Sequence, residues 1–331
     1  MTAAGRHLLS VESLSVRIPG RKGELHAVNQ VSFSLESGRT LAVVGESGSG
    51  KSMFCRAILG ILPTGATMGG EVSFAGTRLS GLCRRELDAV RGKEIGVVLQ
   101  NPMSSLNPTM KIGRQVAEPM LRHLGMSGSE AAARSLELLA AVGIPGPAEK
   151  AGSYPHQLSG GMRQRVAIAM ALSCDPRLLI ADEPTTALDV TVQAEVLNLL
   201  ARLQRERNMA MILVTHDLGV VAGMAHDTAV MYAGEIVEQA ETTELFARMR
   251  MPYTRALFDA IPRIDAPPHT ELAAIGGAPP DLAALPAGCR FAPRCRYAQE
   301  RCRAEEPPLI NDWSEGHRYA CWFPLPVGGR P

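Results

Sequence analysis

The sequence predicts an α/β fold with a parallel-sheet core, and three observations lead to this prediction. A glycine-rich loop follows the apolar run 41–44, and two acids follow a second apolar run at 178–181. The residues between these runs are rich in Ala and Leu, as in 130–139, which is typical of helices. Short apolar strands that alternate with helical segments indicate a sheet covered by helices.

Short strands are expected before the glycine-rich loop and shortly after it. Residues 31–35 alternate between apolar and polar side chains, as a half-buried strand does, and a turn at 36–38 follows. Residues 69–76 read as a second turn and strand. We expect a largely helical segment from about 101 to 175, and an amphipathic helix at 192–207 that covers the parallel sheet.

The glycine-rich loop matches the phosphate-binding pattern G-x-x-x-x-G-K-[ST] in full. Its glycines allow successive backbone N–H groups to converge on a phosphate, and the helix that begins near Lys51 points its positive end there. Lys51 is expected to reach the β- and γ-phosphates of a nucleotide, and the Ser52 hydroxyl to bind Mg²⁺. A Gly/Ser-rich turn is the alternative, but the preceding strand disfavours it. The loop comprises Gly45, Glu46, Ser47, Gly48, Ser49, Gly50, Lys51 and Ser52.

Asp182 and Glu183 follow the second apolar run directly. An acid at the carboxyl end of a strand beside a phosphate loop can hold Mg²⁺, and a second carboxylate can orient and polarise an attacking water. Asp182 is therefore the candidate Mg²⁺ ligand and Glu183 the candidate general base. Two adjacent acids are more often a solvated turn, but the segment 184–189, Pro-Thr-Thr-Ala-Leu-Asp, disfavours that reading here.

The segment 158–165, Leu-Ser-Gly-Gly-Met-Arg-Gln-Arg, lies between the loop and the acids, and with it the chain resembles the ATP-binding subunit of an ABC transporter. The resemblance covers nearly the whole chain. It implies a P-loop NTPase cassette of the ABC type, with a parallel-sheet core, an antiparallel β subdomain and a helical subdomain. Ser159, Gly160 and Gly161 match the signature loop, which in this family contacts the γ-phosphate held by the opposite subunit. Met162 stands where the family more usually has Gln. The peptide-importing branch of the family resembles this chain in having Met at that position.

The resemblance also implies roles for three residues at other positions. Gln100 matches the Q-loop glutamine, which senses Mg²⁺ and the membrane partner. Asp189 matches the D-loop acid that crosses the dimer interface, and His216 matches the switch histidine on the γ-phosphate. The family usually stacks adenine on an N-terminal aromatic residue, but Ile18 occupies that place here and the nearest ring is His26.

Length and composition agree with a large α/β unit and an appendage. The chain has 331 residues, and its hydrophobic content of 46% is enough to bury a core. The net charge is +1, from 34 Lys and Arg against 33 Asp and Glu, so nothing favours a nucleic-acid partner. No apolar run has the length of a membrane span. We expect a peripheral protein at the cytoplasmic face of the inner membrane, associated through partner subunits.

The composition changes after about residue 246, where Pro-rich stretches such as 266–268 and 278–280 begin. We therefore expect an ABC ATP-binding domain at 1–250 and a small C-terminal extension at 251–331. The extension resembles that of oligopeptide and dipeptide importer ATPases.

Four of the seven cysteines lie in this extension. Clustered thiols in a reducing compartment indicate metal or redox chemistry, and the spacing is wider than that of the usual structural zinc site. The spacing leaves three alternatives, which are an iron–sulfur cluster, a zinc site and free thiols. The resemblance implies a [4Fe–4S] cluster, because some importer ATPases of this branch carry one. Its ligands would be Cys289, Cys295, Cys302 and Cys321.

The function that these motifs predict is ATP hydrolysis that powers import of di- or oligopeptides. The implied partners are a second, unlike ABC ATPase in a head-to-tail dimer, two membrane permease subunits and an extracytoplasmic peptide-binding protein. The segment 101–108 is the expected contact with a membrane subunit. Nickel, glutathione and antimicrobial peptides are alternative cargoes, and a soluble ABC ATPase that does not transport is a further alternative.

Overall fold

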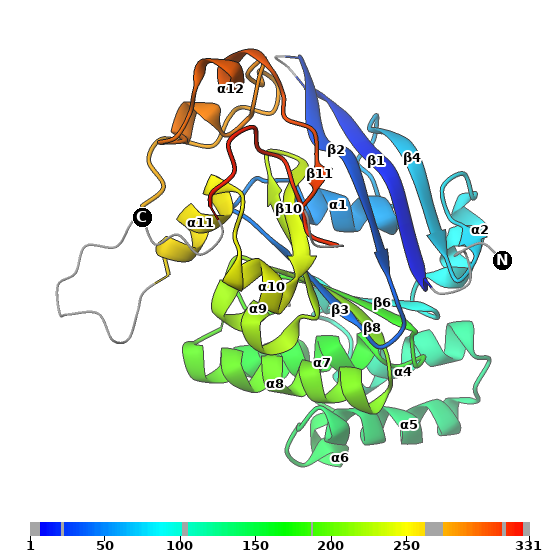
Figure 1. The fold of residues 1–331 in the computed structure, drawn as a ribbon. Coiled ribbons are helices and arrows are strands. Elements are labelled where there is room, and N and C mark those ends of the chain that lie inside the picture. The colour runs from blue at the N-terminus through cyan, green and yellow to red at the C-terminus, as the bar shows by residue number, and fades with distance from the viewer. Residues whose placement is uncertain are drawn as a thin grey trace. The chain divides into compact units, whose positions relative to one another are not determined.

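The computed structural model describes residues 7–20, 23–100, 105–186, 188–261, 274–312 and 316–326 (Figure 1). Half of the expected membrane-subunit segment, 101–104, and the Pro-rich stretch 266–268 lie outside the described residues. The chain divides into two compact units. The first comprises Met1–Leu8, Leu35–Thr40 and Gly81–Val214, and the second comprises Leu9–Ser34, Leu41–Ser80 and Thr215–Pro331.

The first unit contains three parallel strands in the order β8-β7-β6. These are β6 (Ile95–Val98), β7 (Leu178–Asp182) and β8 (Ala210–Thr215), and Ile180 is paired with Val97 on one side and Ile212 on the other. Every residue of β7 and β8 is buried. This confirms the parallel strand predicted at 178–181, because a strand covered on both faces needs a continuous apolar run.

Helices make up most of the rest of the first unit. The longest are α4 (Ile112–His123), α5 (Gly128–Ala141), α7 (Gly160–Ala171) and α8 (Val190–Glu206), and α2 (Arg84–Val90) and α6 (Pro147–Lys150) are shorter. Helix α8 is the predicted amphipathic helix, with Val196, Leu200 and Leu203 on its buried side. Helix α5 begins with a capping box, in which the Ser127 hydroxyl accepts from the Glu130 N–H.

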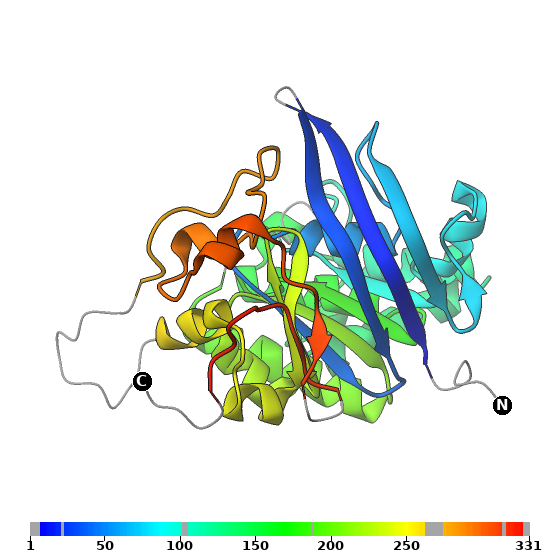
Figure 2. The same ribbon diagram turned by 45° about the horizontal axis from the view of Figure 1, so that its top comes forward.

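The second unit contains an antiparallel sheet with the strand order β2-β1-β4-β5. Its members are β1 (Leu9–Gly20), β2 (Gly23–Leu35), β4 (Thr67–Phe74) and β5 (Thr77–Arg78), and β1, β2 and β4 lie side by side in Figure 2. In β1, buried residues such as Leu9 and Val11 alternate with more exposed ones, as expected for a sheet with one solvated face. The strands predicted before the glycine-rich loop and shortly after it, and the antiparallel β subdomain that the family resemblance implied, are confirmed.

A second group of strands in this unit has the order β11-β12-β10-β9-β3. Strand β3 (Thr40–Val44) is parallel to β9 (Asp227–Tyr232), and the other pairs are antiparallel. The remaining strands are β10 (Glu235–Glu241), β11 (Ile310–Asn311) and β12 (Arg318–Tyr319). The α-helices among the described residues of this unit are α1 (Lys51–Ile58), α9 (Leu218–Met224), α10 (Thr242–Ala247), α11 (Pro252–Asp259) and α12 (Glu300–Ala304).

The cysteine-containing C-terminal segment does not form a compact unit of its own. Phe291 packs in the same buried cluster as Tyr232 of β9 and Tyr253 of α11, with ring centroids 5.3 and 5.2 Å from theirs. Strand β12 pairs with β10, and Nε2 of His317 lies 2.9 Å from the buried Glu238 carboxylate of that strand. The expectation of a distinct extension is therefore corrected, because the segment shares the core of the second unit.

Candidate functional site

The phosphate loop connects β3 to α1 within the second unit, as its sequence predicted. Gly45, Gly48 and Gly50 all have positive φ, at 152°, 80° and 102°. A Cβ atom on Gly45 would lie 2.1 Å from the Met231 carbonyl oxygen, and one on Gly50 would lie 2.3 Å from that of Ala27. Glycine is thus required at both ends of the loop by backbone conformation and by close approach.

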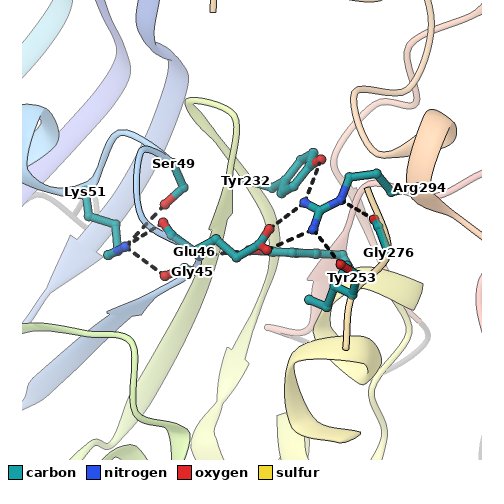
Figure 3. Close-up of polar contacts among 9 residues, drawn as sticks. Gly45, Glu46, Ser49, Lys51, Tyr232, Tyr253, Gly276 and Arg294 are labelled. Atoms are coloured by element: carbon teal, nitrogen blue, oxygen red, sulfur yellow. Dashed lines mark hydrogen bonds and ion pairs between the residues drawn. The ribbon is translucent and has the colours of Figure 1, made fainter. Parts of the chain in front are cut away.

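Lys51 is the first residue of α1 and is only 4% exposed. Its Nζ donates to the carbonyl oxygens of Gly45 and Glu46 at 2.7 and 2.8 Å, and lies 3.5 Å from the Ser49 hydroxyl (Figure 3). The ammonium is therefore held within the curve of the loop, which fits the predicted role of Lys51 toward phosphates. Ser52 follows it in the first turn of the helix.

Glu46 is held by two residues that lie more than 200 positions away in the chain. Its backbone N–H donates to the Tyr253 hydroxyl at 2.9 Å. Its carboxylate accepts from Nη1 and Nη2 of Arg294 at 2.6 and 2.9 Å. Burial raises the pKa of the Tyr253 hydroxyl, so this group stays protonated. Sequence reasoning missed both contacts, and the only signals were the position of Arg294 beside Cys295 and that of Tyr253 at the start of the C-terminal segment.

The acidic pair lies at the end of β7 in the first unit. Asp182 is buried, with 6% of its surface exposed. Glu183 has a φ of 46°, an uncommon conformation for a residue other than glycine, and its N–H donates to the Val214 carbonyl at 3.0 Å. Strained conformations of this kind are concentrated at functional sites, because the surrounding structure must hold them in place. The roles of Asp182 as Mg²⁺ ligand and Glu183 as general base stay predictions.

The Glu183 side chain accepts two hydrogen bonds at one carboxylate oxygen, Oε2. Gln100 Nε2 donates at 2.8 Å, and the Thr186 hydroxyl also donates at 2.8 Å. The structure thus brings together two residues that the sequence predicted separately, Gln100 and Glu183. Thr186 is an addition that sequence reasoning missed, although the segment after the acids had been noted. The two donors orient the carboxylate that would act as a base.

The signature loop leads into α7, and Ser159 is its N-cap. The Ser159 hydroxyl accepts from the Met162 N–H at 3.3 Å. Ser159 and Gly160 are exposed, whereas a Cβ on Gly161 would lie 2.6 Å from Cγ1 of Val192. A helix N-terminus carries partial positive charge and attracts anions, so this exposed end of α7 suits contact with a phosphate.

Asp189 comes between β7 and α8 in the chain, and His216 comes between β8 and α9. Asp189 is the N-cap of α8, and its Oδ1 accepts from the Val192 N–H at 3.0 Å. His216 is exposed and comes directly after β8. The first unit thus contains Gln100, both acids, the signature loop and Asp189, while the second contains the phosphate loop and His216.

The four C-terminal cysteines line one pocket, together with apolar side chains such as Phe291 and Trp322. Burial raises the pKa of Cys289 to about 11 and that of Cys321 to about 12. Across the residues that the structure describes, no group of three or more His, Cys, Asp or Glu side chains has the arrangement of a metal-ion site. This arrangement therefore does not support a single bound metal ion.

No helix in the described ranges combines the length and the hydropathy needed to cross a membrane.

Two families match the chain along different parts of its length. The family described as "ABC transporter" matches residues 28–186. The family described as "Oligopeptide/dipeptide transporter, C-terminal region" matches residues 237–302. The second match covers the segment in which the sequence changes composition and in which Tyr253 and Arg294 lie.

Two solved structures show the same fold. A dimeric ATP-binding cassette in a post-hydrolysis state with ADP and Pi is 29% identical, with a TM-score of 0.64 over 71% of this chain and 98% of that chain. A dimeric bacterial ABC transporter cassette is 30% identical, with the same TM-score and coverage. These similarities confirm the predicted cassette fold.

Curated relatives match the chain almost from end to end. The oligopeptide transport ATP-binding protein OppD of Salmonella typhimurium is 47% identical over 96% of this chain and 94% of its own length. OppD of Bacillus subtilis is 48% identical over 96% and 88%. The dipeptide transport ATP-binding protein DppD of Escherichia coli is 46% identical over 98% and 99%. This chain therefore belongs to the family of oligopeptide and dipeptide ABC transporter ATP-binding proteins and is an ABC transporter ATPase subunit.

Proposed function

We propose that this chain hydrolyses ATP to drive import of dipeptides or oligopeptides through partner membrane subunits. The observation that supports this cargo is the end-to-end similarity to relatives named for peptide transport, together with the peptide-transporter match of the C-terminal region. The proposed partners are two permease subunits, a second ATPase of different sequence and a peptide-binding protein outside the membrane. The chain would act at the cytoplasmic face of the membrane.

The proposed chemistry assigns a role to each group of residues. Lys51 neutralises the β- and γ-phosphates, and the Glu183 carboxylate takes a proton from the attacking water. Mg²⁺, when bound, would neutralise phosphate charge. The oxygen donors of Ser52, Gln100 and Asp182 are of the type that this ion prefers, so they would hold it. Gln100 and Thr186 orient the base through the two hydrogen bonds to its Oε2 atom.

The remaining predicted residues are proposed to act in a head-to-tail dimer. The signature loop, Ser159 to Gly161, whose first two residues are exposed, would contact the γ-phosphate bound by the opposite subunit. Asp189 would lie at the interface of the two subunits, and His216 would contact the γ-phosphate in its own subunit. The dimeric cassettes to which this chain is similar support this assembly.

Reconstitution of the complete transporter in liposomes tests the proposed function. We expect ATP hydrolysis to rise when the binding protein is loaded with a dipeptide or an oligopeptide, and labelled peptide to accumulate only when ATP is present. The control is a transporter that carries Lys51→Ala, which should neither hydrolyse ATP nor transport. Stimulation by nickel or glutathione with none by peptides would contradict the assigned cargo.

We further propose that Cys289, Cys295, Cys302 and Cys321 bind one [4Fe–4S] cluster with a structural role. Support comes from the pocket that all four line. The cluster, when bound, would hold four thiolates together and so tie the C-terminal segment to the core of the second unit. ATP-driven transport needs no redox step, which favours a structural role.

Metal content tests the cluster directly. Protein purified without oxygen should be brown and contain about four irons per chain. Cys302→Ser should lose this iron, whereas Cys83→Ser, which changes an exposed cysteine in the first unit, should keep it. Stoichiometric zinc in a colourless protein, or seven titratable thiols with no metal, would each exclude the cluster.

A further inference from the structure

Arg294 is a buried cation whose hydrogen-bonding capacity is almost entirely used. Its side chain is 4% exposed, and Nε donates to the Gly276 carbonyl at 2.9 Å. Nη1 and Nη2 bind the two oxygens of the Glu46 carboxylate as a fork, and they also lie 3.4 Å from the Tyr232 hydroxyl and 3.3 Å from the Ile275 carbonyl (Figure 3). The carboxylate of Glu46 raises the pKa of the Arg294 guanidinium, so this group stays charged.

The arrangement binds one residue of the phosphate loop at two points. Arg294 holds the Glu46 carboxylate, and the Tyr253 hydroxyl accepts the hydrogen bond of the Glu46 N–H. Tyr253 is itself fully buried, and its ring centroid lies 4.5 Å from that of Tyr232. Side chain and main chain of Glu46 are therefore both anchored to residues of the buried aromatic core of the second unit.

Glu46 transmits this anchoring to the phosphate-binding lysine. The carbonyl oxygens of Glu46 and Gly45 are the two acceptors closest to Lys51 Nζ among its contacts in Figure 3. A displacement of Glu46 would thus move an acceptor of Lys51 and change the curvature of the loop between them. Holding a binding loop in its bound shape reduces the ordering that a ligand must impose, and so increases affinity.

We propose that Arg294 and Tyr253 are positioning residues for the phosphate loop, through which the C-terminal segment sets the affinity for ATP. The inference rests on the proposed role of the loop as the nucleotide site. The bidentate geometry argues for positioning, since two parallel N–H···O bonds restrict orientation as well as distance. An ion pair that contributed only to stability could involve any residue of the loop. This one involves Glu46, whose carbonyl oxygen also accepts from Lys51 Nζ.

Arg294→Gln and Tyr253→Phe test the proposal in the purified chain and in the assembled transporter. We expect Arg294→Gln to raise the dissociation constant and the KM for ATP on the order of 10- to 100-fold, because small displacements of positioned groups have effects of this size. The kcat at saturating ATP should change little. Hydrogen exchange of the loop amides, residues 45–50, should accelerate, and Tyr253→Phe should show the same changes to a smaller extent.

A matched control is Arg301→Gln, which removes an arginine–carboxylate pair from the same segment. Arg301 donates to Glu305 at 2.9 Å, but this pair is exposed and involves no residue of the loop. It should leave KM and loop exchange as in the unchanged protein. Combining Glu46→Gln with Arg294→Gln should be no worse than Arg294→Gln alone, since both changes break the same contact.

The outcomes separate this inference from the proposed function. Loss of ATP binding in Lys51→Ala, with normal affinity and loop exchange in Arg294→Gln, would overturn the inference alone. Binding that survives Lys51→Ala would instead overturn the loop as the nucleotide site. If Arg294→Gln does not fold, Tyr253→Phe decides the question, because it removes only a hydroxyl and keeps the buried ring. Unchanged KM and loop exchange in Tyr253→Phe would then overturn the proposal.

Discussion

Replacing Glu183 by Gln should lower ATP turnover of the assembled transporter by about 10²- to 10⁴-fold, while ATP affinity stays unchanged. The amide keeps the size of the side chain and an oxygen that can still accept from Gln100 Nε2 and the Thr186 hydroxyl. It cannot take a proton from water. Steady-state hydrolysis and equilibrium ATP binding, measured with the change in both ATPases, provide the two readouts.

The control for this substitution is Glu206→Gln, which also removes one carboxylate from the first unit. Glu206 lies at the exposed end of α8 and pairs with Arg202 at 3.8 Å. Exposed pairs of this kind contribute little, so turnover should be unchanged. Hydrolysis at the normal rate in the Glu183 variant would show that another group acts as the base.

Ser159→Arg should suppress hydrolysis at the nucleotide bound by the opposite subunit without preventing ATP from binding to Lys51 of its own chain. The arginine would put a large side chain at the exposed N-terminus of α7, where the proposed dimer needs close approach. Mixed assemblies, in which one subunit carries the change and bound nucleotide is assigned to each site, provide the measurement. Impairment confined to the altered subunit's own nucleotide would contradict the head-to-tail arrangement.

The loss of a helix cap must be separated from this effect, because Ser159 caps α7. Ser127→Arg is the matched control, since Ser127 caps α5 through a hydrogen bond of the same length, 3.3 Å, to the Glu130 N–H. Each substitution should cost about 1 kcal/mol of stability. Only Ser159→Arg should reduce hydrolysis, and equal losses in both variants would attribute the effect to helix stability.

Features that depend on residues close together in the sequence were predictable, whereas contacts between distant segments were not. Strands β3 and β7 follow from uninterrupted apolar runs, and the phosphate loop follows from its glycine spacing, because both depend on neighbouring residues. The left-handed φ of Glu183 has no sequence signal, since only the surrounding fold makes a non-glycine residue adopt it. Thr186 was visible as part of a motif, but its hydrogen bond to Glu183 was not.

The C-terminal segment shows most clearly what sequence reasoning could not supply. Its Pro-rich composition indicated a boundary, and a separate small extension was expected beyond it. Phe291 instead contributes to the aromatic core of the second unit, and Tyr319 of β12 is paired with Glu238 of β10. Pairing partners far apart in the chain are set by tertiary packing, which local propensity does not encode.

The ion pair between Glu46 and Arg294 joins positions that lie 248 residues apart in the chain. If only one of the two residues were replaced, the other would keep its charge in a largely buried position without its partner. Such an unpaired charge is far more destabilising than the loss of both charges. Positions 46 and 294 should therefore covary, so that a related sequence with a substitution at one position also has a substitution at the other. A chimera that exchanges the C-terminal segment with a distant ATPase should need the matching residue in the loop as well.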